Sequence, residues 1–171
     1  GVRLVGSLTS AAIAVLPTAD VAALSNSQMA ALGSDSAGLS TAEAAAFSTQ
    51  QINSLSSIGL ANLTTGALTA LGSAQLKAIS ATSIPGMTSA QIVALDSNIN
   101  NLGTNWGWMS SVQSAALTTN QLASISTTLL ATMNIASAHD PAFSAAQIAA
   151  LGTAVGALAA NTVIGSMSSA E

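Results

Sequence analysis

The chain has 171 residues, which is enough for one domain or one run of repeats, but only 5% of them are charged and 43 are Ser or Thr. Globular domains carry about 25% charged residues, so small hydroxyl side chains must occupy most water-facing positions. Two basic residues, Arg3 and Lys77, against six acidic ones exclude the basic face that binds nucleic acid. The chain has no Cys, which excludes disulfides and thiolate metal sites.

A unit of eight residues recurs along the chain. In chain order its clearest copies are LSNSQMAAL (24–32), FSTQQINSL (47–55), LGSAQLKAI (71–79), MTSAQIVAL (87–95), LTTNQLASI (117–125) and FSAAQIAAL (143–151). The apolar residue that opens each unit can be followed from Leu8 to Met167, and 16 of the 20 intervals between openings are eight residues long. We therefore expect a single repeat array over 1–171, with about 20 units. The new unit that starts at Met167 predicts that this array is a fragment of a longer one.

Four intervals between unit openings depart from eight residues. Three have seven residues and start at Leu32, Leu95 and Leu102, and one has ten residues and starts at Met133. We expect loops or bends at these irregular places, near 33–38, 98–109 and 134–143.

The repeat predicts that a new helix begins in every unit. An α-helix turns about 100° per residue, so an apolar position repeated every eight residues would spiral around a continuous helix. The second position is Ser, Thr, Asn or Asp in 15 of 21 units, which is the preference of a helix N-cap. Gln follows three residues later in seven units, and this spacing is the capping box. The clearest expected capping residues are Ser25, Gln28, Ser48, Gln51, Gln75, Thr88, Gln91, Gln113, Thr118, Gln121, Ser144 and Gln147.

Each unit thus predicts a helix of about six residues. Because helices shorter than about 12 residues are marginal in water, each must pack on its neighbours, as in a solenoid. We therefore expect an all-α solenoid of very short capped helices. The alternative is a β-solenoid, because an even period keeps strand faces in phase. Ala and Gln are not strand-favouring residues, and the capping box has no role in a strand.

Few residues are candidates for chemistry. The single histidine, His139, is followed by Asp140 and Pro141, a turn sequence. A Ser-His-Asp triad whose acid is the next residue in the chain has poor geometry. Asp20 and Glu43 occupy the position of the capping Gln, so we expect a structural role for both. The sequence predicts no catalytic residue, no cofactor and no metal site.

Trp106 and Trp108 are the only tryptophans of the chain, and they lie where two seven-residue intervals meet. We expect packing, with at least one ring inside. The alternative is contact with a ligand or a partner protein through exposed rings.

The units MTSAQIVAL, FSAAQIAAL and LTTNQLASI resemble the LSTAQIAA-type octapeptide arrays of large secreted, adhesin-like or haemolysin-like surface proteins of proteobacteria. The resemblance covers nearly the whole chain. It implies an extracellular or cell-surface location and a structural or adhesive role, and it implies no catalytic or ligand-binding residue.

The sequence therefore predicts a non-enzymatic extracellular structural protein, either an adhesin spacer or a subunit of a filament or surface layer. Its partners would be further repeats or other copies of the chain. The alternative is a binding module that recognises carbohydrate, a host protein or ice through a regular Ser/Thr face or through Trp106 and Trp108. The uncharged stretch 144–167 is interrupted by polar residues such as Gln147 and Asn161 at the repeat intervals, so we expect no transmembrane span.

Overall fold

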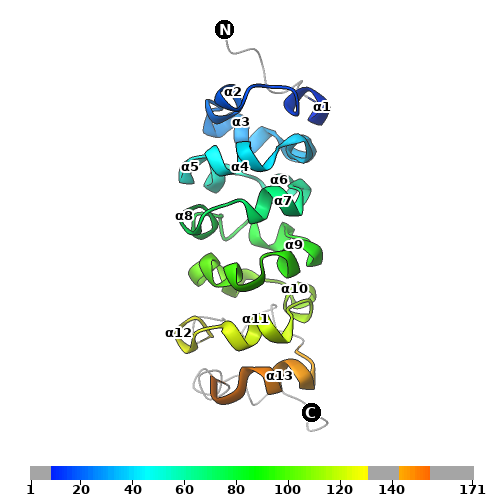
Figure 1. The fold of residues 1–171 in the computed structure, drawn as a ribbon, viewed down its shortest axis with the longest axis vertical. Coiled ribbons are helices and arrows are strands. Elements are labelled where there is room, and N and C mark those ends of the chain that lie inside the picture. Colours follow the sequence, from blue (N-terminus) through cyan, green and yellow to red (C-terminus); the bar gives the residue numbers. More distant parts are fainter. Residues whose placement is uncertain (1–8, 131–142, 155–171) are drawn as a thin grey trace.

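The computed structural model describes residues 9–130 and 143–154. These residues form short α-helices and 3-10 helices (η), stacked in a rod (Figure 1). They contain no strand, so the prediction of an all-α solenoid is confirmed and the β-solenoid alternative is wrong for this part of the chain. No helix within the described ranges is long and apolar enough to cross a membrane.

Three units make one turn of the rod, because each helix packs on the helix three units before it and on the helix three units after it. The first column contains α1 (Ser10–Ile13), η2 (Gly33–Gly38), α6 (Ser57–Asn62), η3 (Ile84–Gly86) and α12 (Thr127–Leu130). The second column contains α2 (Thr18–Ala22), α4 (Thr41–Ala46), α7 (Thr65–Thr69), α9 (Ser89–Ala94) and α10 (Ser111–Ala115). The third column contains α3 (Asn26–Ala31), α5 (Thr49–Ser54), α8 (Ser73–Lys77), α11 (Thr119–Ser124) and α13 (Ala145–Leu151), which is followed by η5 (Gly152–Ala154).

The core of the rod is made by the first and sixth residues of the eight-residue units. In the unit that contains α9, for example, Met87 and Ile92 are 3% and 0% exposed, and Leu63 and Leu68 of the unit below are buried in the same way. Full burial of one such side chain contributes about 1.5–3 kcal/mol. This burial between columns and turns explains how helices of four to seven residues persist although none would be stable alone.

The seven-residue intervals, where we expected loops or bends, form 3-10 helices instead. In each of them the second residue has a positive φ: 49° at Gly33, 47° at Asp96 and 58° at Gly103. These shorter units bury their fifth residue rather than their sixth, and Ser36, Ile99 and Trp106 are its three occurrences. A 3-10 helix advances farther per residue than an α-helix, so a unit with one residue fewer still keeps its place in a column. The third irregular stretch, 134–143, lies almost entirely outside the described residues.

The long element η4 (Asp96–Trp108) consists of two units that join at Gly103, where φ is 58° and ψ is −140°. Before this glycine, Asn100 donates a hydrogen bond to Ser124 of α11, in the third column. After it, Asn105 donates to the carbonyl of Ile79, just before the first-column element η3. The chain therefore passes from the third column to the first at Gly103.

Candidate functional site

Capping boxes start most of the helices in the second and third columns. At the start of α5, the backbone N–H of Gln51 donates to Ser48 Oγ over 3.2 Å, and the backbone N–H of Ser48 donates to Gln51 Oε1 over 2.8 Å. The same box is formed by the pairs Ser25–Gln28, Ser40–Glu43, Thr88–Gln91, Ser110–Gln113, Thr118–Gln121 and Ser144–Gln147. At α8 the cap residue is Gly72, which has no side chain, so only its amide is bonded, to Gln75 Oε1 at 2.7 Å.

Asp20 does not have the capping role that its position predicts. The N-cap of α2 is Pro17, and no side chain caps this helix. Proline has no amide hydrogen, so the carboxylate has no cap N–H to accept from. Asp20 is exposed at the surface.

Six glutamines also join successive turns of the rod, a role that the sequence analysis missed. Gln91 Nε2 donates to the carbonyl of Leu60 over 2.8 Å and to that of Leu63 over 2.7 Å, both in the turn below. Equivalent bonds are made by the other members of the set, which we call the Gln ladder: Gln51, Gln75, Gln91, Gln113, Gln121 and Gln147. All six side chains are buried.

The Gln ladder pairs backbone groups that very short helices leave without hydrogen-bond partners. The first four N–H groups and the last four C=O groups of any α-helix have no partner within it, so a six-residue helix leaves most of its backbone unpaired. In each ladder residue, Oε1 accepts a hydrogen bond from the backbone N–H of the N-cap residue of its own helix. Nε2 donates to backbone carbonyl oxygens one turn below, near the junction between two units. One amide side chain thus pairs backbone groups in two turns.

The first column has no ladder glutamine. Smaller polar groups join its turns: Ser36 Oγ donates to the carbonyl of Gly59 over 2.6 Å, Ser83 Oγ to that of Leu55 over 2.7 Å, and Asn105 Nδ2 to that of Ile79 over 2.7 Å. Here the backbones also approach more closely. A Cβ atom on Gly38 would overlap the Ser10 carbonyl, and one on Gly86 would overlap the Ser57 carbonyl.

The two tryptophans have different environments. Trp106 is fully buried, because the shortened unit turns its fifth residue inward, and its Nε1 has no hydrogen-bond partner. The expectation that at least one ring packs inside is therefore confirmed. As a contact residue for a ligand, however, Trp106 is excluded by its burial, whereas Trp108 is 50% exposed.

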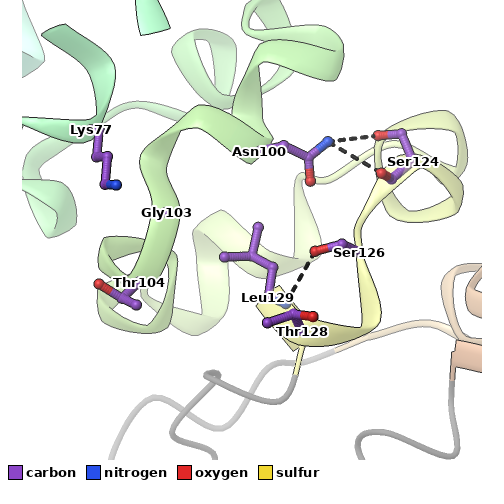
Figure 2. Close-up of a pocket in the computed structure, with 8 residues that line it drawn as sticks. All are labelled: Lys77, Asn100, Gly103, Thr104, Ser124, Ser126, Thr128 and Leu129. Carbon is purple, nitrogen blue, oxygen red and sulfur yellow. Dashed lines mark hydrogen bonds between the residues drawn. The ribbon is translucent and has the colours of Figure 1, made fainter. Parts of the chain in front are cut away.

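A groove of about 490 Å³ opens beside Gly103 (Figure 2). Its walls come from successive turns of the rod, and most of their accessible surface is apolar, with hydroxyl and amide groups and one cation set into it. The lining residues are Lys77, Asn100, Gly103, Thr104, Ser124, Ser126, Thr128 and Leu129. Nothing in the sequence motif pointed to this groove, because it arises where two shortened units change column.

Residues 9–130 and 143–154 contain no group of three or more His, Cys, Asp or Glu side chains that could hold a metal ion. His139 and Asp140 lie outside the described residues.

Comparison of the chain with protein-family models, with curated proteins and with solved structures finds no match. What defines the class of this molecule is thus its architecture: a three-column solenoid of capped octapeptide helices.

Proposed function

We propose that the chain is a non-enzymatic structural element, a rod that serves as the spacer of a surface adhesin or as a subunit of a filament or surface layer. One observation carries this proposal. The polar side chains that the repeat supplies most regularly, the Gln ladder and the capping hydroxyls, are bonded to backbone within and between turns. The repeat therefore builds length, turn by turn, rather than a reaction centre.

The extracellular or cell-surface location is part of this proposal, and its support is the resemblance to octapeptide arrays of secreted surface proteins. The low charge of the rod supports association between copies. Four acidic side chains and one lysine are spread over the described ranges, so the rods would repel one another only weakly.

A length experiment tests the spacer version. Stacked helices lie about 8–10 Å apart, so each added turn should lengthen the rod by about 9 Å. We would duplicate residues 55–78, which are three units and one full turn, between a membrane anchor and a fluorescent tip. The tip should move outward by that step with each duplicated turn. A tip height that does not depend on the number of turns would contradict the spacer role.

The matched control duplicates only residues 55–70, which are two units. This insertion places the second copy of 55–62, a first-column unit, over the third-column helix α5. That unit has Gly59 at its fifth position, so no glutamine reaches the carbonyls of Ala44 and Phe47 to which Gln75 donates. We expect this variant to lose stability without gaining one regular step of length. For the filament version, electron microscopy of the unaltered chain should show assemblies, and single rods at every concentration would contradict it.

A further inference from the structure

The groove of Figure 2 runs along the rod. Lys77 ends α8, Thr104 follows Gly103 in the next turn, and Thr128 lies in α12, one turn further. With stacked helices about 9 Å apart, the groove reaches across roughly two such spacings. A groove of this form suits an extended ligand better than a compact one.

Lys77 gives the groove a positive charge. Its side chain is exposed and forms no ion pair within the described ranges, and it carries the only charge among the described residues that line the groove. Its stem lies against Gly103, since a Cβ on this glycine would be 3.7 Å from Lys77 Cγ and 3.9 Å from Lys77 Cε. An ammonium group held at a groove wall favours a ligand that carries an anionic group.

The Asn100 amide adds an acceptor that lacks a donor. Its Nδ2 donates to Ser97 O over 3.1 Å and to Ser124 Oγ over 3.2 Å, which fixes the orientation of the amide. Its Oδ1 is buried without a hydrogen-bond partner and points toward the groove (Figure 2). A buried acceptor without a donor costs about 1–3 kcal/mol, so a ligand hydroxyl that reached it would remove this cost.

The remaining walls combine apolar surface with exposed hydroxyl groups. Thr104 and Thr128 expose hydroxyls that have no protein partner within the described ranges, and a hydroxyl both donates and accepts hydrogen bonds. We propose that this groove binds a segment of an acidic polysaccharide, with a sugar carboxylate on Lys77 and sugar hydroxyls on Asn100 and the threonines. This binding goes beyond the structural role of the rod.

A second groove on the third column supplies an internal comparison. It measures about 320 Å³ and is lined by Asn26, Thr49, Gln50, Asn53, Ser54 and Ala78. It is more polar than the groove beside Gly103 but has no cation among its described lining residues. Its Asn53 Nδ2 donates to the Ala78 carbonyl over 3.0 Å, and no buried polar atom of Asn53 is left without a partner. We expect no binding of the same sugar there.

The test is a titration of ¹⁵N-labelled protein with trigalacturonate, an acidic trisaccharide, followed by NMR. Saturable shifts are expected at Lys77, Asn100 and Thr104 and over 124–129, while the backbone signals of 49–54 stay in place. Neutral galactotriose, sodium acetate and inorganic phosphate are the comparison ligands, and each should bind at least tenfold more weakly.

Two variants of Lys77 complete the design. Lys77→Gln removes the charge and should lower the affinity roughly ten- to hundredfold, the range for one charge-assisted hydrogen bond. Lys77→Arg keeps the charge and should stay within a few fold of the original chain. Because Lys77 is exposed, circular dichroism should show the same fold in both. Equal binding of acidic and neutral trisaccharides, equal shifts in the two grooves, or unchanged binding by Lys77→Gln would overturn the proposal.

Discussion

Gln91 and Leu63 are 28 residues apart in the chain, yet Gln91 Nε2 donates to the Leu63 carbonyl oxygen over 2.7 Å. The other end of the same amide, Oε1, accepts from the Thr88 N–H over 2.8 Å. A side chain that is 1% exposed thus connects the start of one helix to the turn below it. We therefore expect these buried glutamines to contribute to the stability of the rod, because each one joins two turns.

The first prediction concerns Gln91→Ala. The change leaves the Thr88 backbone N–H and the Leu63 carbonyl without the Gln91 partner in a buried site, and leaves the Leu60 carbonyl with only the Leu63 N–H. We expect the free energy of unfolding to fall by about 3 kcal/mol, since each buried unpaired group costs about 1–3 kcal/mol. Urea unfolding followed by circular dichroism measures it.

Gln28→Ala is the matched control for that change. Gln28 forms the same capping box with Ser25 but no hydrogen bond to another turn within the described ranges. Loss of a cap alone costs about 1 kcal/mol. Equal losses for the two variants would show that the bonds between turns add nothing.

The second prediction concerns the close approach at Gly86. A methyl group there would overlap the backbone C and O atoms of Ser57, which cannot turn aside, and would also lie 2.8 Å from Ser57 Cβ. We expect Gly86→Ala to lower the free energy of unfolding by about 3 kcal/mol, at the upper end for overpacking. Gly66→Ala is the control, because its Cβ would meet nothing closer than 3.5 Å. Since Gly66 lies inside helix α7, alanine there should stabilise by about 0.5–1 kcal/mol. Two alanine variants with the same sign and size would contradict the close-contact explanation.

The third prediction exchanges residues between two shortened units. Asp96 has a φ of 47°, which glycine adopts at the equivalent positions Gly33 and Gly103. A residue other than glycine with such a backbone costs about 1–3 kcal/mol, so Asp96→Gly should stabilise the rod by about 1 kcal/mol. Gly33→Asp should destabilise it by a similar amount, although no atom lies within 4 Å of the added Cβ. Thermal unfolding of both variants gives the signs, and a stabilised Gly33→Asp would reject the backbone argument.

The fourth prediction concerns Glu43, which occupies the Gln position in α4 and is 3% exposed. Its Oε2 accepts from the Ser40 amide over 2.7 Å, but a carboxylate has no N–H to donate to the carbonyls of the turn below. Glu43→Gln keeps the acceptor and adds this donor, so we expect a gain of about 1 kcal/mol. Glu43→Ala, which loses both, should be less stable than the original chain. If Glu43→Gln unfolds at a lower urea concentration than the original chain, the ladder explanation at this position is contradicted.

The helices and their caps could be predicted from the sequence because these signals are local. Ser48 and Gln51 are three residues apart, and a single unit contains the whole capping box. The stacking of turns could not be predicted from one unit, because Gln147 bonds to Leu117 across 30 residues and neighbouring units resemble one another. A longer pattern did carry this information: the first-column units that open at Leu32, Leu55, Ile79 and Leu102 have no amide or acid at the fifth position.

The irregular units were harder to interpret than the regular ones. A missing residue suggested a loop, but the positive φ at Gly33 and Gly103 allows a 3-10 helix that keeps the column. The same change moves the buried position from six to five, and this places Trp106 inside and leaves Trp108 half exposed. The groove beside Lys77 arises from two such units in succession, so no single motif indicates it.

Successive caps of the second column, Ser40, Thr64 and Thr88, are 24 residues apart, and each turn contacts only the turns next to it. A pull on the two ends of such a coil passes the same force through every turn in series. The contacts between two turns would then give way together, and each released turn would add about 80 Å of slack chain. Under a stretching force the molecule would therefore extend in steps, as one turn after another unfolds while the remaining turns stay folded.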